Sequence, residues 1–402
     1  MFSSYRHVLS RPGALAFTSA AFVGRLPIAM VGLGIVLMVE HHTGSYGLAG
    51  SVSATYVVAN AVTAPMLARL LDRRGQRRVL PLAIGGYGAA LALLMWAVPH
   101  GAPIVVAFVL AALTGGAMPP IGSSVRARWT HLLRGRPELQ TAYAIEGVVD
   151  EVIFMVGPII VIALATTVTP VVGLAAPLVL GVGGTVLLAA QRATEPPVDP
   201  RDPRVTTQAP LGWRSLLPLI VACVALGSLF GSAEVVTIAF TDEAGRPGTA
   251  AVLLAVWALG SLLAGLVTGA VTWRAVPLRR FKLGALALAV TMSPLPFVGS
   301  IPVLGLVLFV AGFAIAPTMI ASIGAVQATV PPARLTEGIA WVTTGLTAGV
   351  APGAALAGRM VDVYGASAAF WVSAVSGLVA AALALATRTR RPTAAAAPST
   401  AV

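Results

Sequence analysis

The chain has few charged residues. Asp, Glu, Lys and Arg together make up 10% of its 402 residues, whereas a soluble domain carries about 25%. So few charges cannot cover a water-facing surface, which excludes an ordinary soluble fold. Hydrophobic residues make up 57% of the chain, and the mean hydropathy is +0.90. Lipid is therefore the expected solvent for most of the surface.

Acidic residues are scarcer than basic ones, which gives a net charge of +12. In a soluble protein this excess would suggest a nucleic-acid partner. The basic residues do not form the aromatic-interleaved patches of a nucleic-acid binder. They lie between apolar runs, where they would set the orientation of a membrane protein. We therefore expect a lipid bilayer, and no nucleic acid, as the partner of this surface.

The sequence also lacks the signatures of catalysis. It has one cysteine, Cys223, so it cannot form an intrachain disulfide. It contains no phosphate-binding loop, metal-ligand spacing or nucleophile motif, and its five histidines fall at the termini and in loops. We expect no enzyme, no metal and no cofactor. Any transport would then use an ion gradient or be passive.

Long apolar runs are what the sequence does have. A membrane-spanning helix needs about 20 apolar residues, and lipid requires every backbone polar group to be paired within the protein. The runs are continuous rather than alternating, which favours helices over a barrel. Pro294 and Pro296 interrupt the ninth and weakest run. Twelve spans are predicted, at about 14–39, 46–68, 79–98, 103–124, 141–165, 170–190, 216–240, 249–272, 283–299, 302–328, 337–359 and 366–386.

The positions of the basic residues predict the topology. The termini and the loops after even-numbered spans carry every Lys and Arg except Arg25, Arg246 and Arg359. Cytoplasmic loops carry this excess in membrane proteins. We therefore predict a multi-pass protein of the inner (cytoplasmic) membrane, with both termini in the cytoplasm.

One long connection divides the chain. Residues 191–215 are rich in proline and mixed charges, which predicts a solvated linker. The linker would separate six-span bundles at 1–190 and 216–390, and the segment 391–402 is predicted to be a disordered tail.

A short motif follows the second predicted span. Asp72 lies at a helix end and is followed by Gly75 and a basic cluster, an arrangement that can hold a neighbouring helix end by charge. The segment resembles the loop signature of the major facilitator superfamily, G-x-L-x-D-R-x-G-R-[RK]. Ala68 and Gln76 depart from the signature. The matching residues are Leu70, Asp72, Arg73, Gly75 and Arg77.

The resemblance implies an all-α membrane protein with twelve transmembrane helices in two pseudo-symmetric six-helix bundles. It further implies a monomer that moves a small-molecule substrate by alternating access, with Asp72, Arg73, Gly75 and Arg77 as a gating loop. Two motifs of proton-driven exporters are incomplete here: Ala111 stands where the fourth-span arginine is expected, and the fifth-span motif retains only Gly157-Pro158 from its core.

The favoured hypothesis is proton-coupled efflux of a drug or metabolite. One alternative is a proton-coupled or passive importer of a small nutrient. Another is a non-transporting membrane receptor or scaffold on the same fold.

Ionisable residues inside spans point to function, because each costs about 2.5–3.5 kcal/mol at a helix centre. Span five contains Glu146, Asp150 and Glu151, and span one contains Arg25. We expect Arg25 to pair with Glu151 or Asp150 near the middle of the membrane, and Glu146 to lie nearer the cytoplasmic, wetter end. The acids of span five, Glu151, Asp150 and Glu146, are predicted to couple transport to protons. Glu151 would be the principal proton carrier, assisted by Asp150 and modulated by Arg25. A permanent structural pair is the alternative.

Other polar or amphipathic groups lie within spans. They could contact the substrate, although such groups often serve helix packing instead. Glu234 lies in the outer half of span seven and could line the cavity or its mouth. The predicted substrate cavity consists of Arg25, Tyr56, Asn60, Met118, Glu151, Glu234 and Trp341.

Overall fold

The computed structural model describes residues 2–44, 46–198, 211–246, 249–271, 273 and 275–387. Within these ranges the chain is helical and forms no strand, which confirms the all-α prediction. The predicted linker is described only over 191–198 and 211–215, and the predicted tail 391–402 lies outside the described residues. In chain order the helices and 3₁₀ turns are α1 (Phe2–Leu9), α2 (Ala14–Arg25), α3 (Pro27–Thr43), α4 (Tyr46–Arg74), α5 (Gln76–Ala97), α6 (Ile104–Ala117), α7 (Ile121–Leu132), α8 (Leu139–Thr167), α9 (Pro170–Ala190), α11 (Trp213–Glu243), α12 (Thr249–Ala270), α13 (Pro277–Met292), η1 (Leu295–Phe297), α14 (Ile301–Thr329), η2 (Pro332–Arg334), α15 (Leu335–Tyr364) and α16 (Ala366–Ala386).

Eleven helical segments in the described part of the chain are long and apolar enough to cross a membrane. The ninth predicted span is the exception. Helix α13 has 16 residues, or about 24 Å at 1.5 Å per residue, which is less than the roughly 30 Å hydrocarbon core. A 3₁₀ turn, η1, follows α13; Pro294 directly precedes this turn and Pro296 lies within it. Each proline lacks the backbone N–H that a continuing helix would use. The twelfth span therefore stays a prediction.

Two predicted spans are broken within the apolar region. The first consists of α2 and α3, which meet at Leu26 just before Pro27. The fourth consists of α6 and α7, separated by Met118, Pro119 and Pro120. Each break lies where proline removes a backbone donor. The first break places Arg25 at the C-terminal end of α2.

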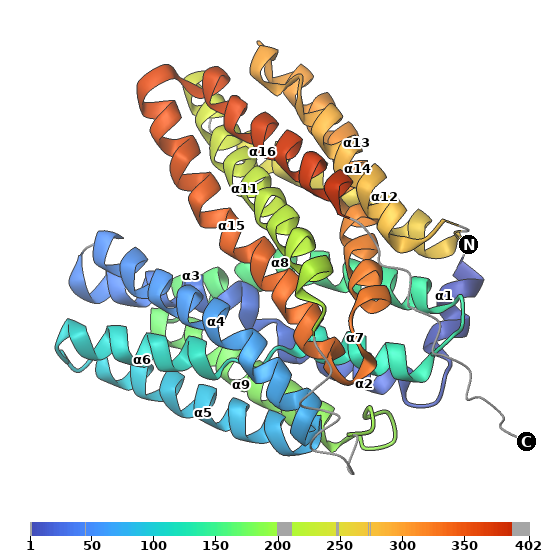
Figure 1. Cartoon of the computed structure of the whole chain (residues 1–402). Coiled ribbons are helices and arrows are strands. Elements are labelled where there is room, and N and C mark those ends of the chain that lie inside the picture. Colours follow the sequence, from blue (N-terminus) through green and yellow to red (C-terminus); the bar gives the residue numbers. More distant parts are fainter. Residues whose placement is uncertain are drawn as a thin grey trace, which may run out of the picture.

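The helices form two bundles (Figure 1). We call α1–α9 the first bundle, coloured blue to green, and α11–α16 the second bundle, coloured yellow-green to red. In the first bundle α4 packs on α6 and α2 on α9; in the second, α11 packs on α15 and α16, and α12 on α14. The bundles meet mainly through α4 with α15 and α8 with α12. In Figure 1 the ribbons converge near α7 and the start of α15 and diverge away from it.

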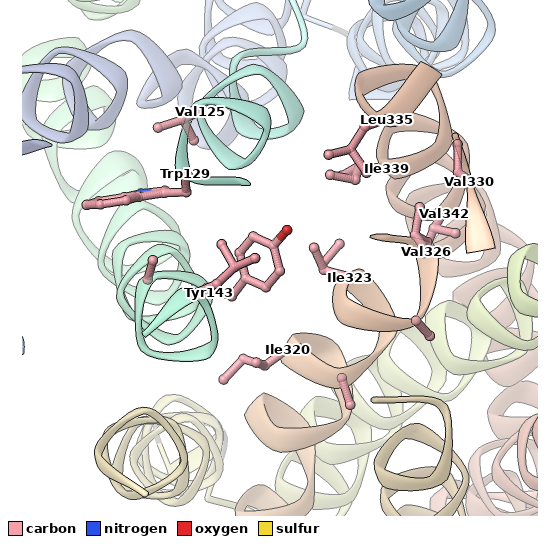
Figure 2. Packing of buried hydrophobic residues seen from close by; sticks show 14 of the residues in the cluster. Val125, Trp129, Tyr143, Ile320, Ile323, Val326, Val330, Leu335, Ile339 and Val342 are labelled. Carbon is pink, nitrogen blue, oxygen red and sulfur yellow. The ribbon is translucent and has the colours of Figure 1, made fainter. Parts of the chain in front are cut away.

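An apolar cluster fills the junction of the bundles. Trp129 of α7 and Tyr143 of α8 belong to the same buried cluster as Ile323 of α14 and Ile339 of α15. Figure 2 shows Tyr143 directed towards Ile323 across the junction, while the Trp129 ring points the other way, into the first bundle. All four are 7% exposed or less. Burial of this apolar surface, worth about 25 cal/mol per Å² where water would otherwise reach it, stabilises the joined arrangement.

Small residues bring α11 and α15 into backbone contact. A Cβ atom on Gly349 would overlap the backbone oxygen of Val224, and one on Gly227 would overlap that of Leu346. Such close approach is the usual packing mode of membrane helices, because lipid gives no hydrophobic force between them. On another face of α11, the Ser232 hydroxyl lies 2.9 Å from that of Ser373 in α16.

Candidate functional site

Asp72 joins the two bundles at one end of the molecule. Its carboxylate accepts hydrogen bonds from the backbone N–H groups of Thr336 (3.3 Å) and Glu337 (2.9 Å) in the first turn of α15. Those N–H groups carry the positive end of the helix dipole, which favours an anion. Glu337 in turn pairs with Arg334 at 2.7 Å. Asp72 thus contacts a neighbouring helix end, as its position in the sequence suggests; its gating role stays a prediction.

The rest of the loop motif shapes the turn between α4 and α5. Gly75 has a φ of +85°, a value that residues with a Cβ rarely adopt. The backbone N–H of Arg77 donates to Glu195 at 2.9 Å, which ties the start of the linker to the motif. The side chains of Arg73 and Arg77 are exposed. Gln76, which departs from the family signature, is buried and accepts from Arg128 Nε at 2.7 Å.

Two hydroxyl groups add contacts between the bundles at the end where Asp72 meets α15, which we call the motif end. The Tyr5 hydroxyl of α1 donates to the carbonyl of Leu266 in α12 at 2.6 Å. Thr141 at the start of α8 donates to the carbonyl of Gly269 at 2.6 Å. Burial raises the pKa of the Tyr5 phenol, so the hydroxyl remains a donor at neutral pH. The motif end is therefore closed by hydrogen bonds as well as by the apolar cluster.

A cluster of charges lies inside the first bundle. Arg25 Nη1 donates to Asp150 Oδ1 at 2.8 Å, and its Nη2 pairs with Glu146. Arg126 Nη2 donates to Asp150 Oδ2 at 2.6 Å. The indole N–H of Trp129 donates to Glu146 Oε1 at 2.8 Å. We call these five residues the ion cluster.

The ion cluster balances its own charge. Two guanidinium groups face two carboxylates, and each of the four carboxylate oxygens accepts a hydrogen bond. Arg25 and Arg126 are 4% and 7% exposed, and Glu146 is fully buried. Buried ions need this degree of pairing, because removing one partner leaves an uncompensated charge. The expectation that Glu146 is hydrated is wrong, since the residue is fully buried and Trp129 of α7 donates to it.

Arg126 and Trp129 were not among the predicted site residues. The fourth predicted span ended at residue 124, so both residues were assigned to a loop, whereas α7 continues to Leu132. The sequence contains neither Gly nor Pro from residue 123 to residue 134, and this pattern could have predicted the longer helix. That stretch permits a helix to continue and so to carry Arg126 towards the fifth span.

Glu151 does not join the ion cluster. Of the two predicted partners for Arg25, Asp150 is confirmed and Glu151 is not. One residue along a helix turns the side chain by about 100°, which directs Glu151 towards α12 of the second bundle. There its Oε1 accepts a hydrogen bond from the Ser261 hydroxyl at 2.7 Å. Among the described residues, Glu151 forms no ion pair with a basic group.

The other predicted cavity residues lie apart. Tyr56 and Met118 are 4% and 3% exposed and pack in the apolar core of the first bundle. Asn60 donates to the carbonyl of Gly115 at 3.3 Å, within the same bundle. Trp341 of α15 is half-buried, with its ring edge-on to another tryptophan. Glu234 of α11 is exposed.

Several solved transporter structures share this fold. The human organic anion transporter MFSD10 (TETRAN) is 17% identical, with a TM-score of 0.67, and the match covers 93% of this chain and 100% of that one. A bacterial homologue of the iron transporter ferroportin, in an outward-facing state, is 14% identical with a TM-score of 0.72 and coverages of 92% and 98%. FucP, the E. coli fucose:proton symporter, in the outward conformation is 13% identical with a TM-score of 0.72 and coverages of 95% and 100%.

No curated protein matches the chain. The sequence model of the Major Facilitator Superfamily matches residues 17–332 and 279–401, which is most of the chain. Together with the helical architecture, these matches identify the general class of the protein: the chain is a multi-pass membrane protein that belongs to the major facilitator superfamily of transporters.

Proposed function

We propose that the protein is a proton-coupled secondary transporter that exports a small molecule, a drug or metabolite, across the cytoplasmic membrane. In this proposal the bundles at 1–190 and 216–390 rock against each other. The excess of basic residues in the loops supports a cytoplasmic position for the motif end. The contacts of Asp72, Tyr5 and Thr141 then hold a state that is closed to the cytoplasm.

One observation carries the proposal of coupling. Glu151 is a half-buried carboxylate in a span, and its hydrogen-bond donor, Ser261, belongs to the other bundle. Movement of one bundle relative to the other would break this bond and change the hydration of the carboxylate. The proton occupancy of a carboxyl group depends on its hydrogen bonds and on its hydration. Glu151 is therefore suited to bind a proton in one state and release it in the other.

The ion cluster has a different role in this proposal. Both of its carboxylates are neutralised within one bundle, so bundle movement need not change their partners. Arg25 then acts as a positioning residue: it fixes Asp150 beside Glu151 and does not switch Glu151 itself. Asp150 and Glu146 keep the arginines in place rather than carry the coupled proton.

Gating is assigned to the loop motif. Rocking that opens the cytoplasmic side would separate Asp72 from the first turn of α15. Gly75 supports the turn, and Arg73 and Arg77 supply exposed positive charge at the predicted cytoplasmic surface. In this proposal Tyr56, Asn60 and Met118 shape the wall of the first bundle through packing, and Trp341 borders the gate.

The experiment compares wild type with Glu151→Gln in proteoliposomes that contain a pH-sensitive dye. Ethidium and a set of uncharged and anionic fluorescent dyes serve as transport probes. For a probe that the wild type moves, we expect the variant to lose pH-driven accumulation while exchange at equal pH survives. Asp242→Asn, an exposed acid at the other end of α11 from the linker, is the control. Accumulation by Glu151→Gln at the wild-type level would contradict the proposal.

A further inference from the structure

The spans carry carboxylates that no arginine neutralises. Arg25 and Arg126 are both committed to Glu146 and Asp150 within the ion cluster. Glu151 and Glu234 form no ion pair in the part of the chain that the structure describes. The two arginines are buried, whereas Glu151 is half-buried and Glu234 is exposed. The charge that these spans offer to a ligand is therefore negative.

An aromatic pair connects the two free carboxylates. Ser261, the partner of Glu151, lies one helical turn from Trp257 on α12. The ring of Trp257 contacts that of Phe230 on α11, with centroids 5.8 Å apart and an interplanar angle of 61°. Glu234 lies one turn beyond Phe230 on α11. We call these five residues the acidic-aromatic wall.

The indole N–H of Trp257 lacks a hydrogen-bond acceptor, which is a separate indication of a ligand at this wall. Its side chain is 8% exposed, and its indole Nε1 has no hydrogen-bond partner among the described residues. Burying an N–H group without a partner costs free energy. Trp257 lies on the same face of α12 as Ser261, so an acceptor atom on a ligand seated against the wall would satisfy this donor.

We propose that the acidic-aromatic wall binds an organic cation with an apolar body, and that this cation is the class of substrate the transporter moves; the second part rests on the proposed function. A positive centre gains Coulomb energy from Glu234 and Glu151, and it is attracted to the faces of tryptophan and phenylalanine rings. The apolar body gains from contact with Phe230 and Trp257. An anion of the same shape meets two uncompensated carboxylates and is rejected.

The test uses two probes of nearly equal shape and opposite charge. Tetraphenylphosphonium and tetraphenylborate are titrated separately into the purified full chain in detergent, and binding is measured by calorimetry without any gradient. We expect tetraphenylphosphonium to bind and tetraphenylborate not to bind. Glu234→Gln should weaken tetraphenylphosphonium binding by about tenfold or more, as expected when one partner of a desolvated charge contact is lost.

Controls separate charge from folding. Asp242→Asn removes an exposed acid two turns further along α11 and should bind like wild type. Phe230→Leu keeps an apolar side chain but removes the ring, and should weaken tetraphenylphosphonium binding by about threefold. This variant tests the wall even if Glu234→Gln does not fold. Equal binding of both ions, or wild-type affinity in folded Glu234→Gln and Phe230→Leu, would overturn the proposal.

The outcome is separable from that of the proposed function. Binding of tetraphenylphosphonium that depends on Glu234, without proton-coupled flux, would support the wall and contradict proton-coupled transport. Proton-coupled flux of an uncharged or anionic dye, with no tetraphenylphosphonium binding, would support the transport mechanism and overturn this substrate class.

Discussion

The helices of the two bundles are held in place by partly different interactions. In the first bundle, Arg25, Arg126, Glu146 and Asp150 link three spans through charge, and the described part of the second bundle has no comparable cluster. Both bundles use close backbone contact: α11 meets α15 through glycines, and a Cβ atom on Gly115 of α6 would overlap the backbone oxygen of Tyr56 in α4. The paired charges are therefore what distinguishes the first bundle. Removing a charge should damage the first bundle, whereas adding a methyl group at a close contact tests the packing that both bundles share.

The contacts that stabilise each bundle differ from the contact used in the proposed coupling. The charges of the ion cluster are satisfied within the first bundle, and the glycine contacts between α11 and α15 lie within the second. Glu151 is bonded across the junction to Ser261. In the proposed mechanism each bundle moves as a unit, and contacts between the bundles, such as those of Glu151 and Asp72, change.

The largest effect is expected from Arg126→Leu. The change leaves Asp150 and Glu146 to share one guanidinium. Breaking a buried ion pair costs about 3–5 kcal/mol, and because the Asp150 side chain is 36% exposed, we expect a loss at the lower end of that range. Thermal unfolding of the purified protein in detergent should show a large drop in melting temperature. Arg73→Leu, at an exposed arginine, should melt like wild type. Equal melting temperatures for the two variants would mean that the ion cluster does not stabilise the first bundle.

A smaller loss is expected from Gly349→Ala in the second bundle. The added Cβ would overlap the backbone oxygen of Val224, and overpacking of this kind costs about 1–3 kcal/mol. Gly358→Ala is the matched control, because it lies on the same helix and its Cβ would meet open space. Alanine favours a helix more than glycine does, so Gly358→Ala should melt at or above the wild-type temperature. Equal melting temperatures for the two variants would mean that close approach at Gly349 does not stabilise the second bundle.

The smallest effect is expected from Ser232→Ala. It removes one hydroxyl contact with Ser373 between α11 and α16, and hydrogen bonds between membrane helices are worth about 0.6 kcal/mol on average. The melting temperature should fall by much less than in Gly349→Ala. A drop as large as that of Arg126→Leu would show that side-chain polarity, and not backbone contact, holds the second bundle.

Much of the fold could be predicted because it depends on local sequence. Runs of apolar residues, scarce charge and the segment from Asp72 to Arg77 led to membrane helices, a motif loop and the family. The break at the ninth span was also predictable, since proline acts on its own helix. Helix ends that no proline marks were harder to predict. The fourth predicted span therefore ended at residue 124, before the true end of α7 at Leu132.

The site depended on contacts between distant segments. Arg25 could be paired with Glu151 or Asp150 on depth alone, and the structure selects Asp150. Depth follows from counting residues along one helix, at 1.5 Å each. The partner follows from the rotation of each helix about its axis, which is set by packing against several neighbours. Arg126, Trp129 and Ser261 could not be assigned to these carboxylates from the sequence for that reason.

The sequence by itself thus determined the solvent of the chain, the approximate depth of its ionisable groups and the position of the loop motif. Only the tertiary structure decided that Glu146 and Asp150 are neutralised inside one bundle, while Glu151 reaches across to Ser261 in the other. The physical reason is that hydropathy acts residue by residue. The pairing of charges instead depends on which helix faces meet, and adjacent residues such as Asp150 and Glu151 point about 100° apart.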